Sequence, residues 1–438
     1  MKKLMMNIAA GNRFCKHAVF LLLSFNTICL SIAAQTFDPE EWHYESQRPS
    51  VATVFYKDST VLFHGRQTLY LAGGGKTYSN GCWFNKVAVT PGTSYRFTGF
   101  FKTHAVSEVG RTVLATITWL DKSEKQTGYT EYPSLSKNTE NEWQKIEQLY
   151  KAPANARFAK LELHYRWNDS GSVHFGDVTL QGTQAEKPRK VKIATVFYRP
   201  SGAQNNLENL EKFSKKIEAA GKQGADIVCL PEEMTLVGTG QDYVSASEPI
   251  PGPSTEYLGK LAARFNIYIV AGLLEKSGDA VYNTAVLIDR SGRLAGKYRK
   301  LSLPQEEITG GVTPGDNLPV FDTDFGRIGI MICWDVTFPE TARGLATKGA
   351  EIIFLPIWGG NETLARARAI ENQVYLVSSS YDMITAIFGL EGEVLKKATK
   401  ENPVAIAEID LNEQRLLPGL GDLKNRIPRE MPPRKAIE

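Results

Sequence analysis

Apolar and polar residues follow one rhythm along the first part of the chain and another along the second. Between residues 36 and 182 they alternate in short runs, among them 95–101, 113–119 and 160–165. Turn-forming groups such as Pro91-Gly92 separate the runs, and no convincing helical stretch interrupts them. Alternation of this kind is typical of strands with one buried face. Residues 36–183 are therefore predicted to form an all-β domain, a two-sheet sandwich or jelly roll.

From residue 191 the pattern changes to apolar strands that alternate with amphipathic helices. Strands are expected at 192–198, 227–230, 267–274, 327–333, 351–357 and 374–380, helices at 207–222, 339–348 and 363–372, and a hairpin turn at 289–292. This order predicts a layered α/β domain over residues 191–422, and hence an α+β chain of two domains. The polar segment 184–190 is the expected linker. A basic, proline-rich tail at 423–438 is expected to wrap the surface or a partner subunit.

The first 34 residues have the pattern of a secretory signal peptide. Basic residues within the first 16 positions precede an apolar run over residues 18–32, which ends in Ala33-Ala34. Basic, then apolar, then small is the order of such a signal, and cleavage is expected near Ala34. The alternative is an uncleaved membrane anchor, but the polar residues Asn26 and Thr27 interrupt the short apolar run. The pattern predicts an exported protein, either periplasmic or secreted.

Composition limits the classes of partner and the redox chemistry. A net charge of +3 over 438 residues is too weak to indicate nucleic acid or an anionic membrane as a partner. Without the signal peptide the cysteines are Cys82, Cys229 and Cys333. An odd and sparse set in an exported chain argues against a disulfide framework and indicates a free thiol. Cys229 lies in an apolar strand, and we interpret both Cys229 and Cys82 as small buried hydrophobic residues.

Cys333 ends a predicted strand in a half of the chain that contains no histidine. A thiol near its free pKa needs a base or a cation to become reactive, and imidazole cannot supply either one in this half. If Cys333 reacts, carboxylates and lysines must activate it. The six histidines are His17, His43, His64, His104, His164 and His174.

Charged residues stand at the ends of two other predicted strands. Glu232 follows the strand at 227–230, and Lys300 ends the second strand of the hairpin. Functional groups of α/β sheets gather where strands meet loops, so a base, a cation and a nucleophile are expected to converge there. Each residue also has a plainer interpretation. Glu232 could be a solvated loop charge, Lys300 part of a solvated basic cluster, and Cys333 a buried core thiol.

Taken together, these segments resemble the nitrilase superfamily, also called carbon-nitrogen hydrolases. The shared motifs are Pro231-Glu232, Tyr298-Arg299-Lys300 and Ile332-Cys333-Trp334-Asp335, with accessory matches at 282–285, 313–316, 338–340 and 366–372. The resemblance covers residues 190–420 and implies a four-layer αββα sandwich with a triad of Glu232, Lys300 and Cys333. It also implies an auxiliary carboxylate, for which Glu307 is chosen over its neighbour Glu306.

The resemblance further implies a reaction in which Cys333 forms a thioester with the acyl part of an amide. Lys300 helps Cys333 to ionise, Glu232 takes its proton, and Lys300 and the backbone N–H of Trp334 stabilise the oxyanion. Glu232 then protonates the leaving amine and activates water, while Glu307 positions Lys300 or the substrate amide. No cofactor or metal is needed, and the lack of histidine argues against zinc in this domain.

The residues around Cys333 narrow the substrate class. The pair Trp334-Asp335 is similar to the amidase and carbamoylase branches, whereas true nitrilases usually have Trp-Glu. Relatives that bind a substrate carboxylate commonly carry arginine where this chain has Val336 and Thr337. A small uncharged or amine-bearing amide or ureido substrate is therefore expected. Aromatic residues are candidates for the pocket wall, with the core as the alternative. They are Trp358, Tyr375 and Tyr381.

The all-β domain resembles galactose-binding-like or carbohydrate-binding jelly rolls. Residues 171–180 are similar to the last strand of that fold. Aromatic rings can stack on sugars, so a glycan is a candidate partner, although large aromatic residues more often fill a sandwich core. The tryptophans concerned are Trp42, Trp83, Trp119, Trp143 and Trp167.

The sequence thus predicts an exported amidohydrolase of two domains that cleaves a linear, non-peptide C–N bond, either an amide or an N-carbamoyl group. The resemblance implies a homodimer. Two other interpretations stay open. In one, an amine instead of water takes the acyl group from the thioester, which makes the protein an N-acyltransferase. In the other, the chain is a non-catalytic glycan-binding protein that keeps a hydrolase scaffold.

Overall fold

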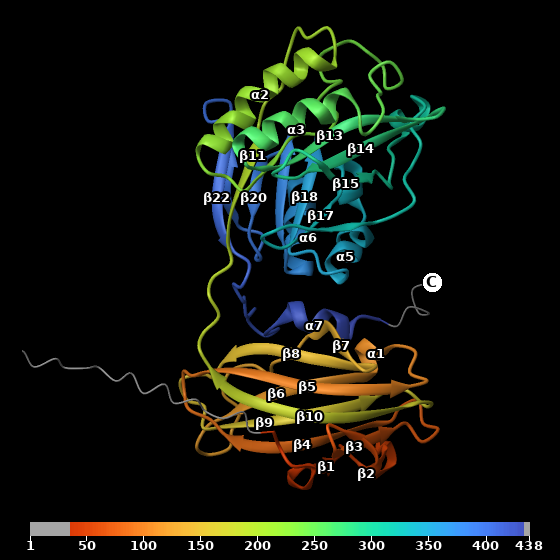
Figure 1. The fold of residues 1–438 in the computed structure, drawn as a ribbon, viewed down its shortest axis with the longest axis vertical. Coiled ribbons are helices and arrows are strands. Elements are labelled where there is room, and N and C mark those ends of the chain that lie inside the picture. Colours follow the sequence, from red (N-terminus) through yellow and green to blue (C-terminus); the bar gives the residue numbers. More distant parts are fainter. Residues whose placement is uncertain (1–35, 433–438) are drawn as a thin grey trace, which may run out of the picture.

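The computed structural model describes residues 36–432. The predicted signal peptide at 1–34, and the last six residues of the predicted tail, lie outside the described residues. Residues 43–183 form two antiparallel sheets that pack face to face, called here the N-terminal sandwich (Figure 1). Its strands are β1 (His43–Glu45), β2 (Val54–Phe63), β3 (Arg66–Ala72), β4 (Asn80–Ala88), β5 (Ser94–His104), β6 (Val113–Leu120), β7 (Leu135–Glu140), β8 (Trp143–Lys151), β9 (Phe158–Arg166) and β10 (Ser172–Thr183). Short helical segments accompany them, η1 (Pro39–Glu41), η2 (Pro49–Val51) and α1 (Val109–Thr112).

The core of the N-terminal sandwich lies between a four-stranded sheet, β1-β4-β9-β6, and a six-stranded sheet, β2-β3-β10-β5-β8-β7. Leu161 and Leu163 of β9 share this core with Phe97 of β5. Successive side chains of a strand point to opposite faces, which is why the period-two pattern of the sequence produces one buried face. By the same alternation Glu162 and His164 lie on the outer face of the four-stranded sheet.

Four of the five tryptophans considered for sugar stacking belong to the interior. Trp42, Trp83, Trp119 and Trp143 are buried, whereas the side chain of Trp167 is 45% exposed. The Trp167 ring lies near the guanidinium groups of Arg166 and Arg111, at 4.0 and 5.4 Å from the ring centroid. Of these five rings, only that of Trp167 is placed to meet a ligand from solvent.

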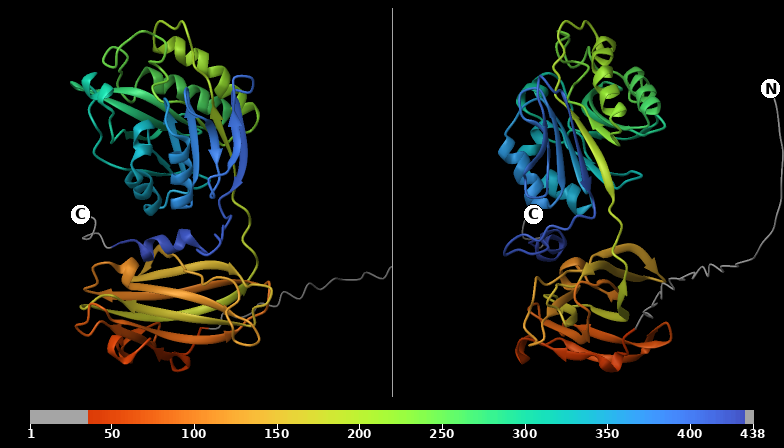
Figure 2. Two further views of the ribbon diagram at one scale, coloured as in Figure 1. Left: turned by 180° about the vertical axis from the view of Figure 1, so that it is seen from behind. Right: turned by 90° about the vertical axis from the view of Figure 1, so that its left-hand side faces the viewer.

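Residues 190–410 form a second sandwich, called here the C-terminal sandwich, in which helices cover two six-stranded sheets (Figures 1 and 2). Between residues 190 and 309 its elements are β11 (Lys190–Val196), α2 (Asn206–Lys222), β12 (Ile227–Cys229), α3 (Pro253–Phe265), β13 (Tyr268–Ser277), β14 (Ala280–Ile288), β15 (Leu294–Arg299) and α4 (Gln305–Thr309). Those that follow are β16 (Val320–Asp322), β17 (Arg327–Ile330), η3 (Cys333–Thr337), α5 (Pro339–Thr347), β18 (Ile352–Ile357), α6 (Glu362–Asn372), β19 (Tyr375–Ser380), β20 (Thr385–Phe388), β21 (Val394–Ala398) and β22 (Val404–Asp410).

The C-terminal sandwich has four layers. Its sheets have the orders β15-β14-β13-β12-β11-β22 and β16-β17-β18-β19-β20-β21. One apolar cluster fills the space between the sheets, a second lies under α2 and α3, and a third lies under α5 and α6. The central strands β11, β12 and β13 are parallel, as are β17, β18 and β19. Parallel strands present their carboxyl ends at one edge, which is where functional groups of such sheets meet.

After β22 the chain reaches the N-terminal sandwich, and α7 (Leu423–Glu430) packs against it (Figure 2). The Arg429 guanidinium donates to the carbonyl of Pro133 at 2.7 Å, and Arg166 donates to the carbonyl of Arg429 at 3.0 Å. The Ser134 hydroxyl donates to Asn425 at 2.6 Å. The segment that the sequence predicts as a tail therefore contains a helix, and this helix lies on the surface of the N-terminal sandwich.

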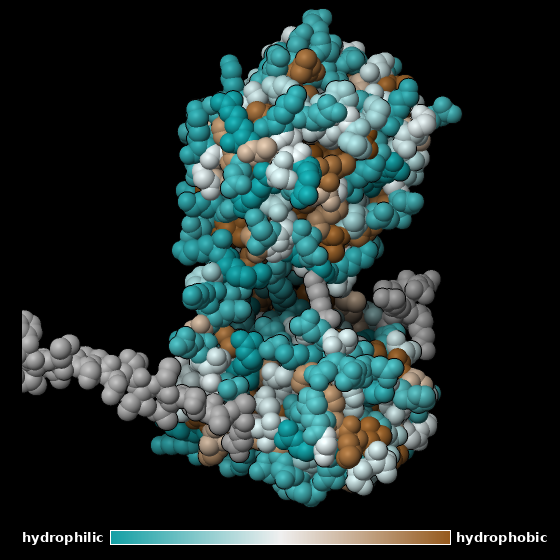
Figure 3. Space-filling view, viewed as in Figure 1, coloured by the Kyte–Doolittle hydropathy of each residue, from teal (hydrophilic) through white to brown (hydrophobic). Residues whose placement is uncertain are grey.

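Hydrophilic residues cover most of the face seen in Figure 3, and hydrophobic residues occur there in small groups. Among the helices within residues 36–432, none has both the length and the apolar character needed to cross a membrane.

Candidate active site

Glu232 lies just after β12 and is almost completely buried. Its Oε1 accepts hydrogen bonds from Lys300 Nζ and from Asn283 Nδ2, both at 2.8 Å. Its Oε2 accepts a hydrogen bond from the backbone N–H of Trp358 at 2.7 Å. Donors therefore hold both carboxylate oxygens in place, and Glu232 is not a solvated loop charge.

Lys300 follows β15 and has no exposed surface. Besides Glu232, its ammonium group contacts the carboxylate of Glu307. Burial alone would lower the pKa of Lys300, but the negative charges of Glu232 and Glu307 outweigh burial and raise the pKa above its ordinary value. Lys300 thus remains an ammonium ion despite its burial, and it does not belong to a solvated basic cluster.

The other two basic residues of that segment have a separate partner. Lys297 Nζ and Arg299 Nη2 lie 2.5 and 2.6 Å from Glu275 Oε1. Lys297 and Arg299 are two residues apart along β15, so their side chains point to the same face of the sheet. Lys300 follows the strand, and its side chain does not join this ion-pair group. The motif therefore contains two different sets of interactions: Lys297 and Arg299 pair with Glu275, and Lys300 pairs with Glu232 and Glu307.

Cys333 is the first residue of η3, and two residues separate it from the end of β17. Its backbone has a φ of 42°, in the left-handed region that residues other than glycine rarely adopt. The half-buried thiol lies 3.7 Å from the carbonyl oxygen of Gly359. Strained backbone of this kind gathers at functional sites, where it re-aims a side chain away from the strand direction.

The charges of Glu232 and Lys300 both act on the Cys333 thiol. Burial and the Glu232 carboxylate raise the pKa of Cys333 well above its ordinary value, and Lys300 opposes them only in part. The sequence predicts that Lys300 helps Cys333 to ionise while Glu232 takes its proton. The raised pKa indicates that the resting thiol keeps its proton, so the step depends on the Glu232 carboxylate as the acceptor.

Asp335 connects the two segments that carry Lys300 and Cys333. Its buried Oδ2 accepts hydrogen bonds from the Tyr298 hydroxyl at 2.7 Å and from the N–H of Ile332 at 2.9 Å. Its Oδ1 accepts from the N–H of Ser302 at 2.9 Å. The turn before the cysteine and the turn after the lysine are thereby fixed to one carboxylate. Asp335 belongs to the motif quoted above, but its positioning role was not predicted.

Glu307 lies on α4 and is buried, whereas its neighbour Glu306 is exposed. This difference selects Glu307 as the carboxylate that meets Lys300. Its pKa is raised by burial, which the charge of Lys300 opposes. Within the described residues, Glu307 Oε2 is buried without a hydrogen-bond partner.

Asn283 of β14 joins three acidic residues through one amide nitrogen. Its Nδ2 lies 2.8 Å from Glu232, 3.1 Å from Glu233 and 3.3 Å from Glu307. One oxygen atom from each of the three carboxylates lies within 4.8 Å of the other two, which is close enough to surround a metal ion. The Lys300 ammonium already supplies a cation to two of them. Asn283 lies in an accessory motif, but that motif does not reveal its bridging position.

Comparison with known proteins identifies the family. The model of the carbon-nitrogen hydrolase family matches residues 192–418. The chain belongs to the carbon-nitrogen hydrolase family. Over 244 residues it is 39% identical to a nitrilase of Pyrococcus abyssi, an alignment that covers 50% of this chain and 90% of that protein. Over 250 residues it is 32% identical to the omega-amidase NIT2 of Bos taurus, covering 50% of this chain and 87% of that protein. The solved structure of Nit3 from Saccharomyces cerevisiae, a member of branch 10 of the nitrilase superfamily, is similar over 50% of this chain and 90% of its own, with 27% identity and a TM-score of 0.46.

In this carbon-nitrogen hydrolase two aromatic residues from the predicted pocket wall form hydrogen bonds to Glu232, one to its side chain and one to its backbone. Trp358 donates its backbone N–H to Glu232, and the Tyr381 hydroxyl donates to the backbone carbonyl of Glu232 at 3.0 Å. Their rings meet edge to face, with centroids 5.0 Å apart. Tyr375, in contrast, belongs to the core between the sheets and donates to Glu413. Of the two assignments considered from the sequence, the core is therefore the correct one for Tyr375.

Proposed function

We propose that the protein hydrolyses a linear, non-peptide amide or N-carbamoyl bond through a thioester on Cys333. The observation that carries this proposal is the buried contact of Lys300 with Glu232, with Cys333 beside both. The three groups supply a cation, a base and a nucleophile at one place. Such a set can carry out acyl transfer without histidine.

In the first half of the reaction, the Cys333 sulfur attacks the carbonyl carbon of the substrate while Glu232 accepts the thiol proton. Negative charge develops on the carbonyl oxygen, where Lys300 Nζ and the backbone N–H of Trp334 stabilise it. Trp334 is the second residue of η3, and N–H groups of a first turn have no partner within the helix. The intermediate collapses, the C–N bond breaks, and Glu232 returns the proton to the leaving amine or ammonia.

In the second half, water attacks the thioester carbon. Glu232 now accepts a proton from the water, so that it acts as a base in one half-reaction and as an acid in the other. The C–S bond breaks, the proton returns to the Cys333 sulfur, and the carboxylic acid leaves. The raised pKa of Cys333 favours this step, because the sulfur takes up the proton as it leaves.

Glu307 is placed to orient the substrate. One of its oxygens contacts Lys300, and the other is buried with no partner among the described residues. A buried carboxylate oxygen without a donor is energetically unfavourable, and a substrate N–H would satisfy it. We assign Glu307 the role of holding the amide nitrogen while Cys333 attacks.

The substrate is proposed to be uncharged or to carry an amine. Val336 is buried, and the Thr337 carbonyl accepts a hydrogen bond from Arg368, so neither residue offers a cation to a substrate carboxylate. Arg199 lies 5.3 Å from the ring centroids of both Trp358 and Tyr381, but Asp382 neutralises it at 2.6 Å. Both observations favour an amidase or carbamoylase over an enzyme for acidic amides.

Three further features are proposed on the basis of the sequence. The signal-peptide pattern supports export to the periplasm or the medium. The sheet order of the N-terminal sandwich and the exposed ring of Trp167 support a galactose-binding-like module for a glycan. A homodimer follows from the resemblance to the family. Light scattering of the purified protein tests the dimer, and a glycan array tests the module.

The decisive experiment is a panel of carboxamide, ureido and nitrile compounds, assayed for released ammonia. Hydrolysis of an uncharged or amine-bearing amide, with stoichiometric labelling of Cys333 by an electrophilic nitrile, supports the proposal. Release that depends on an added amine, with a new amide as product, would favour acyl transfer instead. Glycan binding without Cys333 labelling would favour the non-catalytic interpretation.

A further inference from the structure

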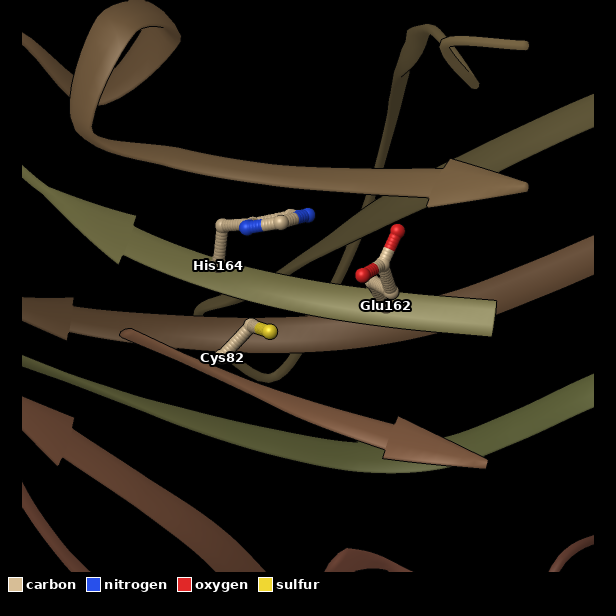
Figure 4. Close-up of side chains that lie close together, drawn as sticks. All are labelled: Cys82, Glu162 and His164. Atoms are coloured by element: carbon tan, nitrogen blue, oxygen red, sulfur yellow. The ribbon is translucent and has the colours of Figure 1, made fainter. Parts of the chain in front are cut away.

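A second cluster of reactive side chains lies in the N-terminal sandwich, on the outer face of its four-stranded sheet. Cys82 on β4 is paired directly with His164 on β9, and Glu162 precedes His164 by two residues on the same strand. Residues opposite each other in an antiparallel pair, and residues two apart along one strand, share a face. Figure 4 shows the three side chains on the same side of the two strands.

The donor atoms of this cluster are close enough to bind one ion. One donor atom from each of Cys82, Glu162 and His164 lies within 4.8 Å of the other two. In a tetrahedral zinc site the bonds to sulfur, nitrogen and oxygen place donor atoms about 3.3–3.7 Å apart. Small side-chain rotations would close the difference. Cys82 is 7% exposed, while Glu162 and His164 are half-buried, so solvent reaches the site.

A hydroxyl group at the edge of the cluster fixes the imidazole. Thr116 on β6 donates to Glu162 Oε2 at 3.0 Å and lies 3.1 Å from His164 Nε2. Because the Thr116 hydroxyl donates its proton to Glu162, its oxygen accepts a hydrogen bond from Nε2–H of His164. This leaves the Nδ1 lone pair of His164 for a ligand. Orientation of a ligating histidine by such an outer partner is a regular feature of metal sites.

The charges of the three side chains suit a divalent cation, because a cysteine that binds a metal does so as the thiolate and a ligating histidine is neutral. One thiolate and one carboxylate then balance two positive charges. Lys160, 3.0 Å from Glu162 Oε1, is the competing cation.

We propose that Cys82, Glu162 and His164 bind a zinc-class divalent cation, with a fourth position left to water. A thiolate, an imidazole and a carboxylate together favour zinc over the hard cations magnesium and calcium, which prefer oxygen ligands alone. The sequence alone predicted no metal, because Cys82 is separated from the other two residues by about eighty positions and only the strand pairing unites them. This site is independent of the proposed hydrolysis.

Cobalt(II) and zinc(II) titrations of tag-free, chelator-treated protein test the proposal. One equivalent of cobalt should give the ultraviolet charge-transfer band of a thiolate ligand, and zinc should displace it. Cys82→Ser should abolish the band and weaken zinc binding at least about 100-fold, more than the loss of an outer-shell partner. His164→Gln should weaken binding similarly. Cys333→Ser is the matched control, since it removes the other partly exposed thiol and should leave the band unchanged.

A band that persists in Cys82→Ser, or zinc binding that is equal in wild type and His164→Gln, would overturn the proposal. If a variant does not fold, the wild type still gives an answer. Zinc should protect Cys82 from alkylation by iodoacetamide, measured on the peptide by mass spectrometry. Equal alkylation of Cys82 with and without zinc would mean that the cluster is an ordinary hydrogen-bonded group.

Discussion

Lys300 Nζ lies 2.8 Å from Glu232 Oε1, and both side chains are buried. The ammonium group also contacts Glu307, so one cation serves two carboxylates. A buried charge is costly unless it is paired and hydrogen-bonded, and this arrangement satisfies the condition through Asn283 and Trp358 as additional donors. The same contact that stabilises the buried charges holds the Glu232 carboxylate in place.

Replacing Lys300 with methionine should remove both stability and activity. Two buried carboxylates would lose their cation, at a cost of about 3–5 kcal/mol in the free energy of unfolding. Burial already raises the pKa of Glu307, and loss of the opposing Lys300 charge would raise it further in the folded state, so the loss should be largest at pH 8 and shrink toward pH 5 as this carboxylate takes up a proton. Urea denaturation at the two pH values measures this. Lys297→Met is the control, because Glu275 keeps Arg299; an equal effect in both variants would contradict the prediction.

Cys333→Ala should lower turnover at least about 1000-fold and leave the fold intact. Alanine has the same Cβ as cysteine, so the backbone strain at φ 42° is unchanged. The free energy of unfolding should change by no more than about 1 kcal/mol. Ammonia release and urea denaturation are the measurements, and Cys82→Ala is the active control. Turnover of Cys333→Ala close to that of the wild type would exclude the thioester.

Glu307→Gln and Glu306→Gln form a matched pair of neighbouring residues on α4. Glu307 is buried against Lys300, and Glu306 is exposed. The first change should lower kcat/KM at least about 10-fold, because the substrate N–H loses a charged acceptor worth about 1.5–3 kcal/mol. The second should leave it within twofold. Equal kinetics for the two variants would show that Glu307 does not meet the substrate.

Much of the C-terminal sandwich could be predicted because its signals are local. The helix at 207–222 was predicted within one residue of α2 (Asn206–Lys222), where Asn205 caps the first turn. The α3 helix was missed, although Pro253 at its first position and apolar residues at helical spacing were available signals. The strand at 327–333 was predicted too long. Its last residues turn into η3, and nothing in a cysteine predicts a positive φ.

The candidate site was predictable only where one segment carries the information. Glu232, Lys300 and Cys333 each follow a strand, and their motifs stand within short stretches of sequence. The bridging position of Asn283 depends on how β14 faces two separate loops, which no local pattern contains. The raised pKa of the resting Cys333 thiol was not predictable for the same reason, since burial is a property of the whole fold and outweighs the charge of Lys300.

Asp335→Asn should weaken the connection between the segment that carries Lys300 and the segment that carries Cys333. The carboxylate accepts from Tyr298, Ile332 and Ser302, and an amide would turn one acceptor into a donor that faces other donors. A loss of about 2–4 kcal/mol in the free energy of unfolding is expected, with a lower kcat. Tyr298→Phe removes only one of the three bonds and should cost about 1 kcal/mol. If the two variants were equally stable, Asp335 would not organise the site.

Stability should depend on pH through Glu131, which lies where the C-terminal segment meets the N-terminal sandwich. Gln414 donates to Asp422 at 3.0 Å and to Glu131 at 3.4 Å. Burial, together with the charge of Asp422, raises the pKa of Glu131 from 4.5 to about 7. The folded state therefore keeps a proton that the unfolded state releases above pH 4.5, so this stabilisation is complete below pH 4.5 and is lost as the pH rises through about 7.

The loss between pH 5 and pH 8 should be on the order of 2–3 kcal/mol, and Glu131→Gln should abolish that part of the pH dependence because its amide stays neutral. Urea denaturation of the two proteins at both pH values measures the difference. The exposed pair of Glu124 with Lys86 provides the control, since Glu124→Gln should change stability by less than about 1 kcal/mol at either pH. A Glu131→Gln protein that loses as much stability as the wild type would place the titrating group elsewhere. If stability falls less between pH 5 and pH 8 in Glu131→Gln than in the wild type, and Glu124→Gln behaves like the wild type, then the Glu131 carboxyl group makes the packing of α7 depend on pH.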